Sequence, residues 1–527
     1  MAMIIRTKNV IVNGSRTVTV TQLYGQMLTT MTSSGSQSDA QSPIYLLPPE
    51  ILGNIFGLAV IACKDAYVCK WPPRNIGYRS YATFFNFSFV SQHWRSVALS
   101  TPYIWGTLLF ISRKLVSVML ERSKMANLSI HSQLSYRLPA VPLIMEVMND
   151  HISRITEIAL DIRTSEFLTL MEDLKQRPPS LRPCELRLRL TVGHNQTFPS
   201  AILVTDRLKV LEAENLTFAW EPSQSFPCLT HLTLGTTSLK IPIPDIITSL
   251  RGMPALEFLH IRNSLASEEY ASPIQPVQLA RLQILEIISE KYDSSSIPIF
   301  LTLITLPAAT DILIYCNNFM WHRPRLSAFA LSLHTLFRNM HMQPLQSFWA
   351  CRSVNNGLQL MSSAPDVETH HLFIKFDLIL EVGHSPEETM RMIFPALLRD
   401  EILSWRLGFG LCSKILFELS DTLPRLCNVV LEGDSMPNFI AVMMIGKNSS
   451  FPFPNLRCLT LYRAKFSSRF HTGLEAHELR KCLAERSKFG IKLEKLKISC
   501  CYRIYDKDIQ RLREVVDVEW DGIVAKR

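Results

Sequence analysis

The strongest constraint on the fold is an apolar triplet with the spacing Leu-x-x-Leu-x-Leu, which recurs after residue 150. Its members are Ile155/Ile158/Leu160, Leu208/Leu211/Ala213, Leu229/Leu232/Leu234, Leu256/Leu259/Ile261, Leu282/Leu285/Ile287, Ala309/Ile312/Ile314, Leu426/Val429/Leu431, Leu456/Leu459/Leu461 and Leu493/Leu496/Ile498. From Leu208 onward the starts step by 21, 27, 26 and 27 residues. A period of roughly 20 to 50 residues is typical of arrays whose units bury their strands only against neighbouring units. The sequence therefore predicts an α/β fold in which short parallel strands stack over residues 151–527.

This spacing resembles that of leucine-rich repeats, in which one short strand per unit is followed by a helix or loop. The Asn or Cys that such repeats carry three residues after the last apolar position is mostly missing, since Thr237, Ser264 and Ala464 stand there and only Cys501 fits. We therefore expect irregular turns. The period is also lost between about residues 320 and 420, where SPEETMRMIFPALLRDEILSW has a helical pattern. An ordinary α/β domain is the alternative.

Two short amphipathic patterns precede the repeats, in IYLLPPEILGNIF and FNFSFVSQHWRSVALSTPYIWGTL. Pro49 suits a first helical position, and Glu50 places negative charge near the helix N-terminus. Apolar residues at helical spacing follow at Ile51, Leu52, Ile55, Phe56 and Ala59 and, in the second piece, at Phe87, Val90, Trp94 and Val97. Thr101-Pro102 ends the second helix. The patterns predict a helical pair over residues 44–110 that needs a further partner to bury its apolar faces.

These residues resemble the F-box-like family that is abundant in mushroom-forming fungi. The family pattern is Leu-Pro-x-Glu-Ile-Leu-x-x-Ile-Phe, then Val-x-x-x-Trp-Arg-x-x-Ala, then Thr-Pro-x-x-Trp. The matching positions are Leu47, Pro48, Glu50, Ile51, Leu52, Ile55, Phe56, Val90, Trp94, Arg95, Ala98, Thr101, Pro102 and Trp105. About twenty residues, Cys63 to Thr83, separate the helices and suggest a looped insertion. A helical hairpin without a partner is the plainer alternative.

The resemblance implies a substrate-recognition subunit of an SCF-type ubiquitin ligase, with no catalytic residues of its own. The helical segment would dock onto a Skp-type adaptor, which joins it to a cullin scaffold, and the repeats would bind an unknown target protein. The implied adaptor-binding residues are Leu47, Pro48, Glu50, Ile51, Leu52, Ile55, Phe56, Val90, Trp94 and Arg95. Glu50 and Arg95 would be helix-end and rim charges, whereas each apolar member could instead belong to the core of the module.

The implied organisation has four parts: a flexible Ser/Thr-rich tail over residues 1–43, an F-box-like domain over 44–110, a linker helix and strand over 111–150, and a leucine-rich-repeat-like domain over 151–527. A C-terminal helix would cap the array through Ile509, Leu512, Val515 and Val516. The Val-x-Trp-Asp-Gly segment that follows this helix also resembles the same fungal family.

No pattern in the sequence indicates an enzyme, a cofactor or a metal centre. Phosphate-binding loops, nucleophile elbows and zinc-protease or kinase motifs are missing. His471, His477 and Cys482 lack a fourth metal ligand. His370 and His371 lie on a strand-like pattern, so their side chains should point to opposite faces.

Composition narrows the remaining classes of partner and compartment. The net charge is +9, but the 55 basic residues are dispersed, so we do not expect nucleic-acid binding. The 12 cysteines form no CxxC pair, and no secretory leader or membrane-spanning apolar run is found. We expect a cytoplasmic or nuclear protein. The main alternative to a ligase subunit is a leucine-rich-repeat scaffold outside any ligase.

Overall fold

The structure is a computed structural model in which the chain divides into two compact units. Unit 1 comprises Met1–Ile162 with Leu181–Glu185, and unit 2 comprises Arg163–Ser180 with Leu186–Arg527. The predicted boundaries at residues 110 and 150 both lie inside unit 1. The described residues are 9–12, 16–19, 47–68, 87–110, 112–133, 140–175, 183–190, 196–199, 205–219, 225–235, 240–266, 274–289, 296–319, 323–340, 347–352, 358–363, 374–380, 386–394, 402–444, 451–466 and 475–524.

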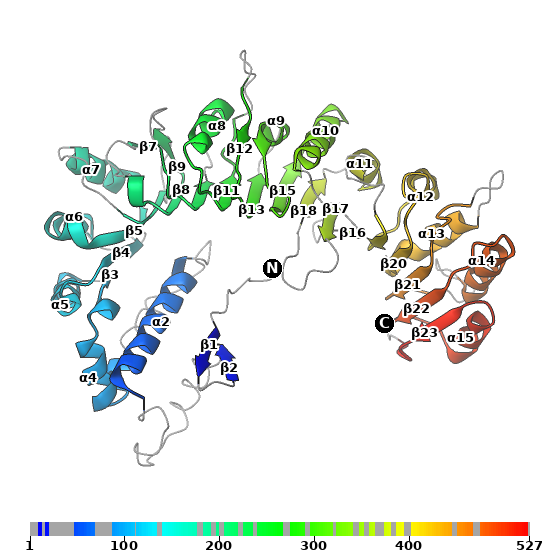
Figure 1. The fold of residues 1–527 in the computed structure, drawn as a ribbon, viewed down its shortest axis with the longest axis horizontal. Helices are drawn as coiled ribbons and strands as arrows, with labels where there is room; N and C mark the ends of the chain where they lie inside the picture. The colour runs from blue at the N-terminus through cyan, green and yellow to red at the C-terminus, as the bar shows by residue number, and fades with distance from the viewer. Residues whose placement is uncertain are drawn as a thin grey trace. The chain divides into compact units, whose positions relative to one another are not determined.

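Unit 1 combines helices with a small parallel sheet (Figure 1). Its elements are β1 (Asn9–Val12), β2 (Arg16–Thr19), α2 (Pro49–Val68), η3 (Phe87–Phe89), α4 (Gln92–Ser100), η4 (Pro102–Trp105), β3 (Thr107–Leu109), α5 (Arg113–Ser123), β4 (Leu128–Gln133), α6 (Ala140–His151), η5 (Ile152–Arg154) and β5 (Ile155–Ile162). Strands β1 and β2 form an antiparallel hairpin, and β3, β4 and β5 pair in parallel. The remainder of the predicted N-terminal tail lies outside the described residues.

Unit 2 is built on one long ladder of short strands. Its members are β6 (Glu185–Leu190), β8 (Val210–Glu214), β10 (His231–Gly235), β11 (Phe258–Arg262), β13 (Ile284–Ser289), β15 (Asp311–Phe319), β16 (Ser347–Arg352), β17 (Leu358–Ser363), β18 (Ile374–Leu380), β19 (Ser404–Leu407), β20 (Asn428–Glu432), β21 (Cys458–Tyr462), β22 (Lys495–Ser499) and β23 (Asp517–Trp520). From β8 to β15 and from β19 to β23, consecutive members of this set pair in parallel and in register. The predicted fold of stacked parallel strands and helices is therefore confirmed at the level of a mixed α/β architecture.

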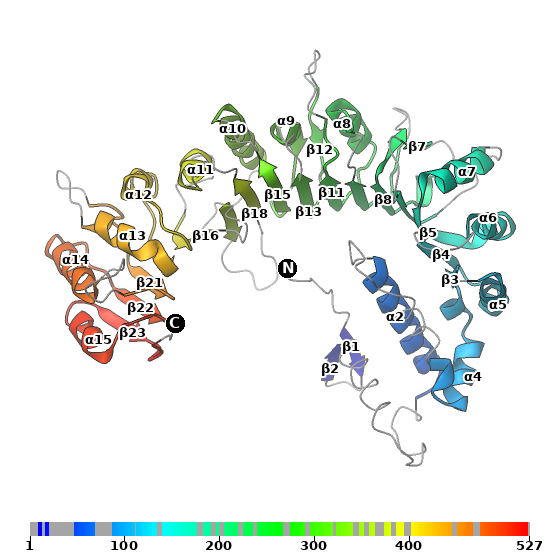
Figure 2. The ribbon, with the colours of Figure 1, turned by 180° about the vertical axis from the view of Figure 1, so that it is seen from behind.

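Helices cover one side of this ladder, as the two opposite views in Figures 1 and 2 show for α8 to α10. The helices of unit 2 are α7 (Thr164–Lys175), η7 (Thr205–Arg207), α8 (Ile243–Arg251), α9 (Ser296–Thr302), α10 (Arg323–Asn339), α11 (Pro386–Ile393), α12 (Ser413–Ser420), η10 (Gly433–Ser435), α13 (Met436–Met443), α14 (Ala476–Lys488) and α15 (Asp506–Arg513). Two further strand pairs, β7 (Gln196–Pro199) with β9 (Leu216–Ala219) and β12 (Val277–Gln278) with β14 (Ile304–Thr305), lie in the connections.

The repeated apolar triplets form the core of the ladder. In eight of the nine triplets all three side chains are buried, and the last two always lie on a strand. The exception is Ala309, which is exposed, while its neighbour Thr310 is buried and donates its hydroxyl hydrogen to the carbonyl of Leu282 at 2.8 Å. Thr310 is therefore buried next to the position where the sequence pattern predicts a buried Ala309. Its hydroxyl can be buried because it donates a hydrogen bond to the Leu282 carbonyl.

The period is lost at a rearrangement of the strand order. Strand β18 pairs in parallel with β15, β17 lies antiparallel between β18 and β16, and β16 pairs in parallel with β19. The segment with a helical pattern in this region is only partly helical, since α11 ends at Ile393 and Ser404 begins strand β19. Trp405 is fully buried on β19, so the strand uses it as a core residue.

The turns after the strands are more uniform than the missing Asn residues suggest. A residue with positive φ stands two positions after the last core residue in five turns, at Asn215, Asn263, Gly433, Arg463 and Cys500. In three of them its N–H donates to the next strand, at Gly235, Ile288 and Ser499, over 2.6 to 3.0 Å. Left-handed backbone of this kind strains residues other than glycine, asparagine and aspartate. Its recurrence shows that the backbone, rather than one residue type, defines the turn.

In two of these turns a short polar side chain hydrogen-bonds to a backbone carbonyl, as the asparagine of a regular repeat would satisfy backbone groups. Ser264 donates its hydroxyl hydrogen to the carbonyl of Leu234 at 3.1 Å, and Cys501 donates its S–H to that of Leu461 at 3.4 Å. Each acceptor is the last core residue of the preceding strand. Buried carbonyls need such partners. The expectation of an irregular turn is therefore wrong at Ser264, while Cys501, the one position that fits the repeat pattern, makes the expected bond.

The last turn is closed by a side chain. Cys500 has the same positive φ as the earlier turn residues, and its N–H donates to a carboxylate oxygen of Asp521 at 2.7 Å. Asp521 follows Trp520, which pairs in register with Ile498. The carboxylate thus accepts the hydrogen bond that a strand carbonyl accepts in the preceding turns. Ile509 and Leu512 are buried on α15 as predicted for the C-terminal helix, but the helix ends at Arg513, so Val515 and Val516 lie beyond it, and only Val516 is buried.

Candidate functional site

Helix α2 begins at Pro49, as predicted, and approaches η4 closely through two glycines. A Cβ atom at Gly53 would lie 3.0 Å from the hydroxyl of Thr101, and one at Gly57 would lie 2.5 Å from the Tyr103 ring. The Tyr103 hydroxyl also donates to Asn54 Oδ1 at 3.2 Å. Glycine inside a helix costs about 1 kcal/mol relative to alanine. Close packing against η4 offsets that cost here.

The core of this helical module is aromatic. Leu52, Phe56 and Trp94 are buried, and the Phe56 ring centroid lies 4.7 Å from that of Phe87 and 5.2 Å from that of Trp94. Phe87 belongs to the 3-10 helix η3 and not to the helix that carries Trp94. The predicted single apolar stripe from Phe87 to Val97 is therefore wrong, and two short helices contribute to it.

Side chains satisfy both ends of α4. The N–H of Trp94 donates to the hydroxyl of Ser91 at 3.2 Å, which caps the first turn. At the other end, the Trp105 indole N–H donates to the Ala98 carbonyl at 2.8 Å and the Thr101 hydroxyl donates to that of Val97 at 2.6 Å. These bonds fix the short helix and the following η4 as one rigid piece beside α2.

A second face of α2 is apolar and open. Ile51, Ile55, Leu58 and Ile61 recur at three- and four-residue spacing on the side away from Leu52 and Phe56, and we call them the outward face of α2. Ile51 is 46% exposed and Ile61 is 51% exposed. The sequence pattern placed Ile51 and Leu52 on a single face, but the structure separates them. A helix that is apolar on all sides is typically covered on all sides.

The ten predicted adaptor-binding residues divide into three groups by burial. Leu52, Phe56 and Trp94 are buried; Leu47, Ile55 and Val90 are half-buried; Pro48, Glu50, Ile51 and Arg95 are exposed. Residues of the first group act in the core of the module, so only the other two groups can touch a partner. The insertion from Cys63 to Thr83 begins inside α2, whose last residue is Val68, and its remainder lies outside the described residues.

The sequence pattern did not single out several exposed apolar residues. Phe89 is 76% exposed, and Ile61 and Tyr103 are about half exposed. Leu58 and Ile61 continue the spacing that begins at Ile51 and Ile55, so a helical wheel followed from Ile51 to Ile61 would have found them. Phe89 lies in a 3-10 helix, where the period of 3.6 residues gives no guidance.

Unit 2 offers a second candidate surface on the side of the ladder away from the helices, which we call the open face. Between β8 and β15 its residues alternate with the core positions. They are Val210, Glu212, Glu214, His231, Thr233, Gly235, Phe258, His260, Arg262, Ile284, Glu286, Ile288, Asp311, Leu313 and Tyr315. All but the buried Gly235 are half-buried, and many are apolar or aromatic. This part of the open face is therefore partly dehydrated.

Between β19 and β23 the open face is covered with ion pairs. Arg406 lies 3.0 Å from Glu432, and its guanidinium stands 5.6 Å from the Tyr462 ring. Glu519 accepts from Lys495 at 2.8 Å and lies 3.4 Å from Lys497, and these bonds to the two ammonium groups lower its pKa. The charges of this half balance one another at the surface.

At the centre of the open face between β8 and β15, the electrostatics differ from those between β19 and β23. His260 Nδ1 lies 3.4 Å from Glu286 Oε2, but burial, aided by nearby Arg262, lowers the His260 pKa to about 4. Burial also raises the pKa of Glu286. At neutral pH the imidazole is therefore uncharged, and this pair is a carboxylate beside a neutral ring rather than a salt bridge.

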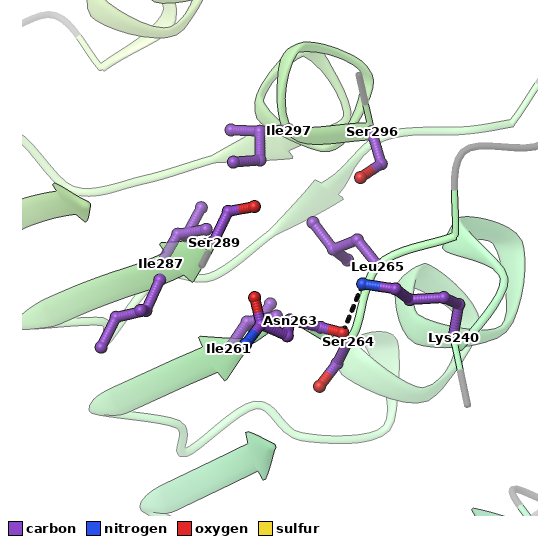
Figure 3. A pocket seen from close by; sticks show the side chains of 10 residues that line it. Lys240, Ile261, Asn263, Ser264, Leu265, Ile287, Ser289, Ser296 and Ile297 are labelled. Atoms are coloured by element: carbon purple, nitrogen blue, oxygen red, sulfur yellow. Dashed lines mark hydrogen bonds between the residues drawn. The ribbon is translucent and has the colours of Figure 1, made fainter. Parts of the chain in front are cut away.

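A small pocket lies at the turn after β11 (Figure 3). The Lys240 ammonium points into this turn and donates to the carbonyl of Asn263 at 2.6 Å. Ser289 and Ser296 line the pocket with Ile287 and Ile297. The free space is about 10 Å³, about what one water molecule needs. The pocket is a packing feature of the turn and is too small for an organic ligand.

Among the described residues, no group of three or more His, Cys, Asp or Glu side chains is placed to hold a metal ion. Of the three residues considered from the sequence, His471 lies outside the described residues, His477 is exposed and Cys482 is buried on α14. Burial raises the Cys482 pKa to about 11, so this thiol is protonated at neutral pH. The His370-His371 pair lies outside the described residues.

None of the described helices has the combination of length and hydropathy that crossing a lipid bilayer requires.

Comparison with known proteins adds no assignment. No model of a known protein family matches the sequence, and no curated protein matches it. The candidate surfaces therefore have to be interpreted from their own chemistry.

Proposed function

We propose that this chain is a non-catalytic substrate-recognition subunit of an SCF-type ubiquitin ligase. In this proposal α2, η3, α4 and η4 form an F-box-like module that docks onto a Skp-type adaptor and through it onto a cullin scaffold. Unit 2 is an irregular leucine-rich-repeat array that holds a target protein. The complex would act in the cytoplasm or nucleus.

The observation that carries the proposal is the outward face of α2. Leu52 and Phe56 already anchor the helix to its own module, so the second apolar face is not needed for that packing. Fully burying an isoleucine side chain contributes about 1.5–3 kcal/mol, and covering Ile51 or Ile61, each about half exposed, would contribute roughly half of that. The exposed Glu50 is next to Ile51 on the same helix, so this face combines exposed apolar side chains with a charged neighbour, as protein interfaces do.

The complex would act by holding the target protein close to a ubiquitin-conjugating enzyme. A target held on unit 2 and a ubiquitin-conjugating enzyme held by the cullin scaffold become parts of one assembly. The effective concentration of the target then reaches the millimolar range when the span is well matched. No bond-making residue is required of this chain.

The test is capture of a Skp-type adaptor by the full chain. We expect the double substitution Ile51→Asp with Ile61→Asp to weaken capture at least tenfold, since two exposed apolar contacts become charged. Leu331→Asp on α10 is the matched control, because Leu331 is also an exposed apolar helix residue, 66% exposed, but lies in unit 2. Undiminished capture by the double variant would refute the docking assignment. Buried Leu52 is avoided because a charge there would unfold the module.

An alternative function is a repeat scaffold outside any ligase. It is favoured by the open face of unit 2, whose chemistry does not depend on unit 1. A folded full chain that captures no Skp-type adaptor would support this alternative.

A further inference from the structure

The open face between β11 and β15 combines apolar side chains with the carboxylate of Glu286 at its centre and that of Asp311 on β15, in register with Ile284. Glu286 on β13 pairs in register with His260 on one side and Leu313 on the other. Ile284 and Ile288 flank it along its own strand, and Phe258 pairs with Ile284. We call these six residues the Glu286 surface. Neighbouring strands lie about 4.8 Å apart, so these side chains form one continuous patch.

The carboxylate of Glu286 is partly dehydrated, with 24% of its side chain exposed. The residues on neighbouring strands do not supply it with a cation. His260 is neutral at pH 7, Leu313 is apolar, and Asp311 on β15 carries a negative charge. The cation on β11 is Arg262, whose guanidinium lies 4.0 Å from Glu214 on β8.

A glycine makes the contact between Glu214 and Arg262 possible. Gly235 on β10 pairs in register with both residues, and a Cβ atom there would lie 3.0 Å from Glu214 Cγ. Because the position between them has no side chain, Glu214 extends across β10 toward Arg262. The guanidinium of Arg262, on the strand next to Glu286, therefore lies toward Glu214 on the other side of β11.

We infer that the Glu286 surface binds a protein segment that presents one lysine or arginine between apolar side chains. The basic group pairs with the Glu286 carboxylate, and the flanking apolar side chains cover Phe258, Ile284, Ile288 and Leu313. This inference deepens the proposed function, because it names the chemistry of the target that unit 2 would hold.

Charge complementarity favours this occupant over others. Glu212 and Glu214 are already paired with Arg187 and Arg262, so the charge that decides is Glu286 itself, and a phosphate group or an acidic side chain placed beside it would meet like charge. A purely apolar segment would bury the Glu286 carboxylate with no cation beside it, only the neutral His260 ring, which costs free energy. A basic residue flanked by apolar residues satisfies both the carboxylate and the patch.

The experiment is selection of displayed random 12-residue peptides on the full chain, followed by affinity measurement. We expect enriched peptides to carry one Lys or Arg flanked by apolar residues. Glu286→Gln should weaken their binding about tenfold or more, and Glu286→Lys should shift the selection toward acidic peptides. Glu519→Gln is the matched control, since Glu519 is an acid on the open face of β23, and it should leave affinity within twofold.

The pH dependence gives an independent readout. Binding of a basic peptide requires ionised Glu286, so affinity should fall as the pH is lowered toward the raised pKa of this carboxylate. Selection of acidic peptides, equal binding to Glu286→Gln, or no enrichment at all on folded chain would overturn the inference. Capture of the Skp-type adaptor is measured on the same preparations and reports on unit 1, so failure of one proposal is distinguishable from failure of the other.

Discussion

The two halves of the strand ladder, β8 to β15 and β19 to β23, have the same backbone arrangement but differ in the side chains of the open face. From β8 to β15 and from β19 to β23 the strands pair in parallel, and both halves contain strands that end in a turn with positive φ, β8 and β11 in the first and β20, β21 and β22 in the second. The first half leaves apolar side chains and Glu286 half-buried, whereas Arg406 and Glu432 pair with each other in the second. The comparison teaches that the core positions set the fold, while the alternating positions can change chemistry from one half to the other.

The largest expected effect tests whether the two cores are equivalent. Leu285 on β13 and Leu459 on β21 are both fully buried at matching triplet positions. We expect Leu285→Ala and Leu459→Ala each to lower the free energy of unfolding by about 2–5 kcal/mol, since each leaves a cavity. Urea unfolding combined with amide hydrogen exchange of each half measures this. A loss below about 1 kcal/mol in one half would break the equivalence.

A smaller effect should separate the halves by pH. The folded-state pKa of His260 is about 4, below the ordinary value of 6.5. Between these values the unfolded chain binds more protons, so stability is lost as the pH falls from about 6.5 to 4. Lowering the pH from 7 to 5 should cost the wild type about 2 kcal/mol more than His260→Gln. Urea unfolding at both pH values measures the difference. Equal pH dependence in the two proteins would contradict the assigned pKa.

The smallest effect should differ in sign between the halves. Glu432→Gln removes a partly exposed ion pair with Arg406, so it should destabilise the protein by about 1 kcal/mol or less and lose this effect in high salt. Glu286→Gln should raise stability at pH 7, because the raised pKa means that ionised Glu286 disfavours the folded state. Thermal unfolding at low and high salt checks both. Equal destabilisation by the two variants would show that Glu286 has a cation partner.

The sequence predicted the core of the array well because burial requires apolar residues at a fixed spacing. Leu211, Leu232 and Leu259 are buried on consecutive strands as expected. The start of α2 at Pro49 was likewise predictable from local backbone chemistry. The rearranged strands β16 to β18 were not, because the choice of pairing partner is a tertiary property that the local pattern does not encode.

The site was harder to predict than the fold. Ile51 and Leu52 are adjacent and both apolar, so the sequence does not distinguish them. In the structure Leu52 packs in the core of the module and Ile51 faces outward. The sequence pattern does not predict the contact between His260 and Glu286 either, because the two residues are far apart along the chain. They meet only through the register of β11 and β13. Gly235 could be recognised as unusual within a strand, but its role depends on Glu214 and Arg262.

Asp521 has a consequence for where a new unit can enter such an array. Its carboxylate accepts from Cys500, in the turn after β22, the hydrogen bond that a backbone carbonyl of the following strand accepts in earlier turns. A unit inserted between β22 and β23 would separate Cys500 from Asp521 and break this bond, whereas a unit duplicated upstream of β22 would leave it intact. Duplication upstream of β22 therefore preserves the turn that joins these two strands.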